Sequence, residues 1–409
     1  MLISLTTERF IWRTYRELQR PFYLSDQQVL KEQWNMFTGT APSGTVVHYA
    51  AMANDDPSII RWFEKQECRI FVGSWDHLRL VQDMGFPSNR IVAGLTSLTE
   101  TQLADLLERV HAVIIGSEIE LDMASFLPGK ANLLIRVNIA EPKKRLRGGL
   151  RTMGLPPDLV TEHWRSWLSR DPRLAGIHSY AGTNILNLRL LAQRAKKAMR
   201  LGSGLPGLKV IDIGGGFPAP AKKAICEEDL DAFWSVAASD LRRDIELWVE
   251  PGRFMVAPTS VFVTAVTEVE LRSGQRCVGT DASVLMFPRR LLFGAPDKDH
   301  PLVVLSPSRH AVSRIWKDVL VMGNTTFSRD VLYKGSMPQV KPKDLLVFSN
   351  AGAYCRTAIP RFLGTIVPPQ VLVPNLKESV NAMTEIVQVR PNVDLDRSAG
   401  TARHYRTCD

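Results

Sequence analysis

The sequence predicts an α/β protein in which a (β/α)8 TIM barrel is followed by an all-β domain of the sandwich or barrel-like kind. Two observations carry this prediction. Over the middle two-thirds of the chain, short apolar segments alternate with mixed-polarity stretches long enough for helices, which is the pattern of repeated βα units. After Pro251-Gly252 the pattern changes to β-branched runs without helical spacers.

Eight apolar segments have the length and composition of buried parallel strands. They are Thr45–Ala50, Arg69–Gly73, Arg90–Ala93, Ala112–Gly116, Asn132–Asn138, Leu174–Ser179, Leu208–Ile213 and Glu246–Glu250. The spans between them, such as Glu100–Val110 and Glu228–Arg243, have room for helices. Eight parallel strands in series imply a closed barrel, whose chemistry lies at the C-terminal strand ends.

The second domain is predicted from β-branched runs at Ser260–Val269, Leu302–Leu305, Asp318–Val321 and Asp344–Phe348. The opening segment contains a predicted helix from Asp26 to Phe37, and we expect this segment to pack on the β domain. The predicted organisation is therefore residues 1–42 as an N-terminal segment, 43–258 as the barrel, 259–375 as the β domain and 376–409 as a flexible tail.

Composition excludes several classes of protein. The 409 residues are 45% hydrophobic, enough for a large core, and no apolar run approaches the roughly 20 residues that cross a bilayer. The five cysteines are widely spaced and odd in number, which argues against a disulfide framework and a metal site. The net charge of +9 comes from dispersed Lys and Arg residues without a nucleic-acid motif. Because Glu8 and Arg9 near the start do not match a signal peptide, we expect a cytoplasmic protein without nucleic-acid or membrane partners.

Three glycines, Gly214-Gly215-Gly216, directly follow the seventh predicted strand. Backbone N–H groups without a neighbouring Cβ can surround a phosphate, and the loops after strands seven and eight are the habitual phosphate site of such barrels. A plain tight turn is the alternative. The eighth strand ends at Glu250, whose carboxylate could pair with a protonated pyridine nitrogen beside that loop. A structural ion pair of Glu250 with Arg253 or Arg136 is the competing interpretation.

The sixth strand ends in His178-Ser179-Tyr180, which places an imidazole and an aromatic ring at the same rim. Tyr180 could stack on a flat heteroaromatic ring, whereas His178 by itself more often indicates a core histidine. Two second-domain segments, Gly323–Asp330 and Asn350–Cys355, follow strand candidates and are predicted to be loops, which can carry function on a rigid frame.

Residues 49 to 54 read Tyr49-Ala50-Ala51-Met52-Ala53-Asn54, which looks like the Tyr-Ala-x-Lys-Ala-Asn box of a pyridoxal-phosphate (PLP) amino-acid decarboxylase. Taken in order with the segments above, it resembles the fold-type III PLP decarboxylases of ornithine, diaminopimelate and arginine, over roughly residues 20 to 370. The resemblance implies a PLP site with members from both domains. They are Gly214, Gly215 and Gly216 at the phosphate, Glu250 at the pyridine nitrogen, Tyr354 at the phosphate from the second domain, and His178, Tyr180 and Arg253 around them.

The resemblance also implies a substrate site and a homodimer. Arg289, in a segment similar to the family's Asp-Ala-Gly…Arg pattern, would meet a substrate carboxylate. In the family, a Gly-x-x-Cys-x-x-x-Asp loop of the neighbouring subunit completes each active site. Here that loop has Thr326 at the cysteine, Phe327 at the acidic residue that reads the far end of a diamino acid, and Asp330 at its final position.

The departures from the family pattern lie at the ring and the substrate. Met52 replaces the lysine that holds PLP as a Schiff base, and a thioether is neither a nucleophile nor a base, so covalent attachment is not expected. Tyr180 replaces a ring-stacking histidine. Phe327 would face the distal ammonium of a free diamino acid without a counter-charge, which is unfavourable. We therefore expect a modified or carrier-tethered amino acid as substrate, and the basic surface would suit an acidic carrier protein.

Two explanations of Met52 stay open, namely a substitution that inactivates an ordinary enzyme and natural divergence, which the other departures favour. The predicted function is that of a PLP-binding amino-acid decarboxylase homologue, a lyase that loses the α-carboxylate as CO2, impaired or diverted by Met52. The alternative is a non-catalytic, regulatory pseudoenzyme that binds PLP, an adduct of PLP or a partner subunit. A third possibility is that another lysine, such as Lys65 or Lys143, reaches the cofactor aldehyde.

Overall fold

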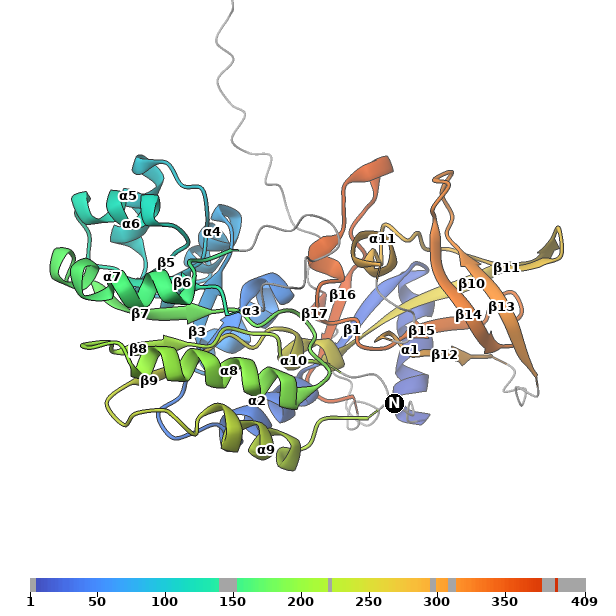
Figure 1. The fold of residues 1–409 in the computed structure, drawn as a ribbon. Helices are drawn as coiled ribbons and strands as arrows, with labels where there is room; N and C mark the ends of the chain where they lie inside the picture. Colours follow the sequence, from blue (N-terminus) through green and yellow to red (C-terminus); the bar gives the residue numbers. More distant parts are fainter. Residues whose placement is uncertain are drawn as a thin grey trace, which may run out of the picture.

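The computed structural model describes residues 5–139, 153–219, 223–294, 299–307, 314–376 and 387–388. Within these residues the chain forms two adjoining domains, a barrel on the left of Figure 1 and a mainly β domain, largely orange, on the right. The predicted fold class, a (β/α)8 barrel followed by a β domain, is confirmed. No helix in the described ranges combines the length and the apolar character needed to span a membrane.

Eight parallel strands close the barrel in chain order, and the last of them pairs back with the first. The strands are β2 (Val46–Ala50), β3 (Arg69–Val72), β4 (Ile91–Ala93), β5 (Ala112–Ile115), β6 (Asn132–Val137), β7 (Leu174–Ser179), β8 (Val210–Asp212) and β9 (Glu246–Val249). All eight correspond to predicted segments. The match is close because strands buried on both faces are continuous apolar runs, a signal that is local in the sequence.

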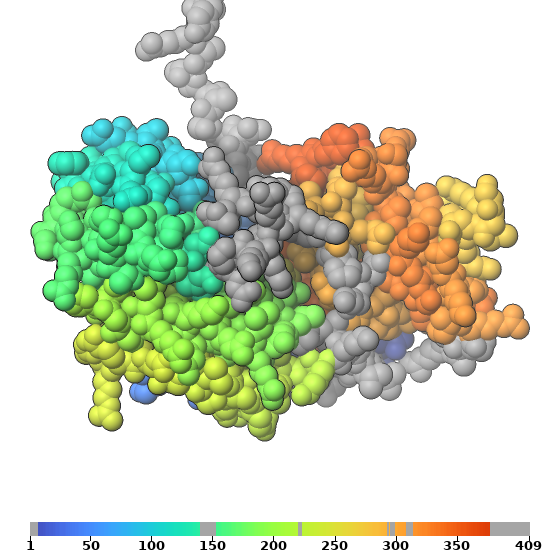
Figure 2. All heavy atoms as spheres, in the orientation of Figure 1, coloured from blue at the N-terminus to red at the C-terminus, as the bar shows by residue number. Residues whose placement is uncertain are grey.

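Helices surround the barrel, and most begin at a residue whose side chain accepts a hydrogen bond from the first turn. They are α2 (Gln27–Thr40), α3 (Pro57–Lys65), α4 (Trp75–Asp83), α5 (Glu100–Arg109), α6 (Glu118–Phe126), α7 (Pro157–Arg170), α8 (Leu188–Ser203) and α9 (Glu227–Ala237). Figure 2 shows α8 and α9 covering the lower face of the barrel. Helix α9 occupies most of the span Glu228–Arg243 and ends at Ala237, and in the turn after it Asp240 O accepts a 2.8 Å hydrogen bond from Ser203 Oγ.

The second domain is a mixed sheet whose main path runs β14-β13-β11-β10-β1-β16-β17, with β15 pairing both β10 and β12. The strands are β1 (Phe22–Asp26), β10 (Ser260–Arg272), β11 (Gln275–Thr280), β12 (Leu302–Leu305), β13 (Ile315–Met322), β14 (Val331–Pro338), β15 (Leu345–Phe348), β16 (Gln370–Val373) and β17 (Val387–Gln388). Strands β11 and β14 escaped prediction because half-exposed polar residues interrupt their apolar runs.

Both ends of the chain contribute to this second domain. Strand β1 lies between β10 and β16, and helix α1 (Leu5–Leu18) places Ile11 in the same apolar core. Strand β17 lies in the segment predicted to be a tail, yet it pairs antiparallel with β16. The other residues beyond Leu376 are outside the described ranges.

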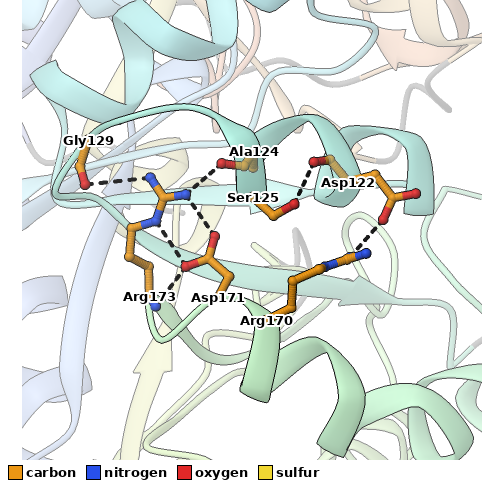
Figure 3. Close-up of polar contacts among 7 residues, drawn as sticks. All are labelled: Asp122, Ala124, Ser125, Gly129, Arg170, Asp171 and Arg173. Carbon is orange, nitrogen blue, oxygen red and sulfur yellow. Dashed lines mark hydrogen bonds and ion pairs between the residues drawn. The ribbon is translucent and has the colours of Figure 1, made fainter.

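A polar cluster holds the end of the barrel opposite the C-terminal strand ends (Figure 3). Arg173, directly before β7, donates to both carboxylate oxygens of Asp171, from Nε at 3.0 Å and from Nη2 at 2.7 Å, and also to Ala124 O. Burial alone would raise the pKa of Asp171, but the hydrogen bonds and charge of Arg173 outweigh burial and lower it. These contacts join α6 to the connection between α7 and β7.

Candidate active site

A cavity of about 280 Å³ lies at the C-terminal ends of the barrel strands, where the second domain meets the barrel. Seven of the predicted cofactor residues line it, together with the residue at the lysine position. They are His178, Tyr180, Gly215, Gly216, Glu250, Arg253, Tyr354 and Met52. The described lining residues come from the ends of β2, β3, β4, β6, β7, β8 and β9 and from the second domain, and none of these described residues is a lysine.

The short turn Ala51–Ala53 presents Met52 to the cavity, and the rest of the motif around it is structural. Tyr49 is fully buried and donates its hydroxyl to Asn54 O at 2.8 Å, which closes the turn. The Asn54 side chain donates to Gly352 O at 2.9 Å, and Tyr354 N donates to Ala53 O at 2.8 Å. The turn is therefore also the point at which the second domain docks on the barrel.

Met52 itself packs against the barrel wall. An ideal Cβ on Gly73 would lie 2.7 Å from Met52 Cε, so the side chain occupies space that only a glycine leaves open. It also contacts the apolar barrel interior that includes Ala50 and Phe71. The position that carries an amine in the motif is thus filled by an apolar chain of nearly the same length.

The glycine segment after β8 forms a cradle that no residue with a Cβ could reproduce. Gly214 and Gly216 have φ values of +66° and +99°, and a Cβ on Gly215 would lie 2.6 Å from Glu250 O. Helix α10 (Arg253–Val256) begins beside this cradle. The buried Arg253 Nε has no hydrogen-bond partner among the described residues. A guanidinium with an unsatisfied Nε next to open backbone fits a phosphate better than it fits a plain turn.

Tyr354 brings the second domain to the same end of the cavity. The guanidinium of Arg253 lies over its ring, 4.8 Å from the centroid. Burial raises the pKa of Tyr354 to about 12, so its hydroxyl remains a hydrogen-bond donor at neutral pH. The two residues together can hold an anion from two sides.

Glu250 faces the cavity from the end of β9 and is 6% exposed. Burial raises its pKa to about 8, although the charge of Arg136 and a hydrogen bond from Asp212 oppose the rise. Its Oε1 lies 3.5 Å from His178 Nε2, and burial lowers the pKa of His178 to about 4, so the imidazole is neutral. In the described part of the chain, Glu250 forms no ion pair with Arg253 or Arg136. The carboxyl group is thus available to a ligand.

Tyr180 and Arg136 form the side of the cavity next to Glu250. The Arg136 guanidinium lies 5.7 Å from the centroid of the Tyr180 ring, a cation–π arrangement. Tyr180 is 41% exposed, so its ring is open to a ligand. Tyr180 could therefore stack on a flat aromatic ring in the cavity that Glu250 also lines.

The predicted substrate residues lie outside this cavity in the single chain. Asp330 uses both carboxylate oxygens to hold its own loop, accepting from Val284 N at 2.6 Å and from Thr325 N at 3.0 Å. In the same loop Thr326 is exposed, and Phe327 packs edge-to-face on Phe362 with 5.6 Å between ring centroids.

Arg289 is 5% exposed and donates from Nε to His300 Nε2 at 3.3 Å. It is not among the residues that line the cavity. Its charge is close enough to contribute to lowering the pKa of Arg253, after the larger effect of burial. The structure therefore places it behind the anion end of the cavity.

Sequence reasoning missed Asp212 and the role of Gly73. Asp212 is the last residue of β8, fully buried, and accepts a 2.7 Å hydrogen bond from Gly214 N. The sequence did contain a signal for Asp212, since it is a charged residue in an otherwise apolar strand, two positions before a glycine run. The sequence contained no signal for Gly73, because its importance depends on a contact with Met52.

Comparison with known proteins identifies the family. The family model described as pyridoxal-dependent decarboxylase, pyridoxal binding domain, matches residues 27–257, more than half of the chain. This chain belongs to the pyridoxal-dependent decarboxylase family. The cofactor of that family is pyridoxal 5′-phosphate.

Similar decarboxylases cover most of the chain at low identity. A probable chloroplastic diaminopimelate decarboxylase of Oryza sativa subsp. japonica is 26% identical over 372 residues, 86% of this chain and 74% of that protein. The L-glutamyl-[BtrI acyl-carrier protein] decarboxylase of Niallia circulans is 24% identical over 397 residues, 90% of each chain.

Solved structures show the same fold. The Vibrio vulnificus lysine/ornithine decarboxylase complexed with cadaverine has a TM-score of 0.79 and 20% identity, covering 91% of this chain and all of that one. The Helicobacter pylori diaminopimelate decarboxylase complexed with L-lysine has a TM-score of 0.76 and 22% identity, covering 88% of this chain and 94% of that one.

The residues of this decarboxylase homologue fit the non-covalent contacts of the family cofactor. The glycine cradle and the free Nε of Arg253 suit its phosphate, and the Glu250 carboxyl, which faces the cavity, suits its ring nitrogen. Among the described residues, the lining contains no amine that could bond to its aldehyde. When bound, PLP supplies an electron sink for a carbanion at the amino acid α-carbon.

Proposed function

We propose that this protein is a decarboxylase homologue that binds PLP, or an adduct of PLP with an amine, without covalent attachment. The observation that carries the proposal is a cavity lined by a glycine cradle, by Arg253 with an unsatisfied Nε and by Glu250, but with Met52 at the lysine position. The ancestral reaction is loss of an α-carboxylate as CO2.

Each cavity residue has a definite part in this proposal. Gly215, Gly216 and Arg253 hold the phosphate, Glu250 faces the ring nitrogen, and Tyr180 covers one ring face. These contacts bind and orient the ligand. An amine at position 52 would transfer the cofactor to the substrate and shuttle protons, and no described residue of the lining offers a substitute for it. The loss of such a group lowers the rate by orders of magnitude.

The proposed substrate is an amino acid whose distal end is apolar, acylated or tethered to a carrier protein. Phe327 and Phe362 form an aromatic pair that offers no counter-charge to a distal ammonium. The relative from Niallia circulans is named as acting on a carrier-protein substrate, which supports this class. The proposed homodimer in the cytoplasm would bring the Gly323–Asp330 loop of one subunit to the cavity of its partner, since that loop does not reach its own.

A second candidate function is a regulatory pseudoenzyme, and Met52 is the observation that favours it. Rescue of the active site by another lysine is not supported by the described residues. Lys65 ends helix α3 and is exposed to solvent, away from the cavity lining. Lys143 lies outside the described residues.

The test is the Met52→Lys variant, with Met52→Leu as the matched apolar control. We expect the natural chain and the leucine variant to bind PLP saturably but to show no covalent PLP mass after borohydride reduction. The lysine side chain can follow the path of Met52 past Gly73, so Met52→Lys should gain one covalent PLP per chain and release CO2 from an amino acid.

Three outcomes separate the possibilities. No saturable PLP binding by the natural chain would refute the proposal. A covalent PLP mass on the natural chain would show that another lysine serves. The regulatory function would be favoured if Met52→Lys binds PLP covalently but releases no CO2 from any substrate tested, either free amino acids or glutamyl groups on an acyl-carrier protein.

A further inference from the structure

The unassigned residue Asp212 lies directly behind the predicted cofactor site. Its carboxyl is fully buried and absent from the cavity lining, whereas Glu250 reaches the cavity. Side-chain atoms of His178, Asp212 and Glu250 all lie within 4.8 Å of one another. Two carboxyl groups therefore meet a neutral imidazole at the base of the cavity.

We infer that Asp212 is a positioning residue that keeps a proton, donates it to Glu250, and thereby lets Glu250 meet a bound ring as a carboxylate. The inference deepens the proposed function and rests on it for the identity of the ring. Asp212 acts on that ring only through Glu250.

The hydrogen bonds decide where the proton is held. Asp212 Oδ1 accepts the 2.7 Å hydrogen bond from Gly214 N, so this oxygen is occupied as an acceptor. Asp212 Oδ2 and Glu250 Oε1 are both buried, and neither has a hydrogen-bond partner among the described residues, although the two carboxyl groups belong to one cluster. A proton on Oδ2 satisfies both carboxyl groups, whereas two buried carboxylates this close would repel each other.

The surroundings make Asp212 the protonated member of the pair. Burial raises the pKa of Asp212 well above its usual value, and the charge of Glu250 raises it further, with His178 and the Gly214 N–H opposing. The charge of Arg136 acts on Glu250 and favours its ionised form. His178 is itself buried and neutral, and the two ionisable neighbours that act on its pKa are Asp212 and Arg136. Glu250 thus ionises first, while Asp212 remains a donor.

Two variants of Asp212 separate this role from a purely structural one. Asp212→Asn keeps the acceptor for Gly214 and offers its NH₂ group to Glu250 in place of the proton. Asp212→Leu has a similar size but no donor. The probe is pyridoxamine 5′-phosphate, which needs no covalent anchor, and its absorbance reports whether the ring nitrogen is protonated.

We expect the bound ring nitrogen to titrate at the same pH in the natural chain and in Asp212→Asn. In Asp212→Leu, Glu250 retains its own proton, and the midpoint should fall by at least about one pH unit, a tenfold change in proton affinity. Equal midpoints in the natural chain and Asp212→Leu, or equal shifts in both variants, would overturn the inference.

The cofactor-free protein provides the second measurement if Asp212→Leu fails to bind the probe or if the natural chain does not bind it. The pH at which Glu250 ionises is read from the pH dependence of the urea midpoint, relative to the same chain carrying Glu250→Gln. This pH should rise by at least about one unit in Asp212→Leu and stay unchanged in Asp212→Asn. If Glu250 ionises at the same pH in Asp212→Leu and Asp212→Asn, the role of Asp212 is refuted. If the natural chain does not bind the probe, only the proposed function is refuted.

Discussion

Replacing Glu250 with glutamine tests whether a neutral carboxyl is buried at the base of the cavity. Glutamine has the shape of a protonated glutamic acid and cannot ionise. The substitution therefore removes one titration and leaves the packing of a residue that is 6% exposed largely unchanged. The cofactor-free protein is the right sample, because a bound ligand would itself stabilise the fold.

The pKa of Glu250 rises from 4.5 in the unfolded chain to about 8 in the folded protein. Between these values the folded protein holds a proton that the unfolded chain has released, so stability falls as the pH increases through this window. Each pH unit corresponds to ~1.4 kcal/mol, which gives at most about 5 kcal/mol over the window. His178 has the opposite effect: because its pKa is lowered in the folded protein, stability falls as the pH drops below the usual pKa of histidine. This contribution of His178 is present in both proteins, so it cancels when the stability of Glu250→Gln is compared with that of the natural chain.

The free energy of unfolding is measured by urea titration from about pH 5 to about pH 9. The two proteins should have similar stability near pH 5. Glu250→Gln should then become the more stable by several kcal/mol at the alkaline end. A difference that stays constant across the range would show that Glu250 is not held as a neutral acid, and the electrostatic argument for the site would fail.

Three other predictions follow from the fold and the site. Arg173→Ala should lower the free energy of unfolding by about 3–5 kcal/mol, because it leaves the buried carboxylate of Asp171 without its partner. Arg170→Ala, which breaks a half-exposed ion pair, is the control and should lower it by about 1 kcal/mol or less. Equal losses in urea titrations of the two variants would contradict this prediction. Gly216→Ala should weaken PLP binding at least about tenfold, since its Cβ would lie 2.5 Å from a carbonyl oxygen at positive φ. Gly274→Ala, also at positive φ but in open space, is its control in PLP titrations, and equal affinities would argue against the cradle. Phe327→Glu, added to Met52→Lys, should increase the ratio of CO2 release from a diamino acid to CO2 release from an apolar amino acid. If this ratio does not change, Phe327 is not part of the substrate site.

Several features of the site were predictable because they depend on chain order. The C-terminal ends of barrel strands meet at one rim, so Glu250 and the glycines after β8 had to lie near each other once the strands were recognised. Met52 was recognised from the resemblance of residues 49–54 to the family's lysine box, and its place after β2 puts it at the same rim. The loop that carries Tyr354 was predicted only as a loop and from the resemblance to the family. Its contact with Ala53 depends on how two domains dock.

The sequence by itself determined the barrel, the change to a β domain after Pro251, and the absence of an amine at position 52. These are local properties, namely apolar runs, their spacing and the chemistry of one side chain. Only the tertiary structure decided that Met52 packs on Gly73 and that Asp212 stands behind Glu250. It also decided that Arg253 is left without a hydrogen-bond partner at Nε among the described residues. Each of these depends on distances between side chains from different strands and on their burial, and no pattern along the chain specifies either.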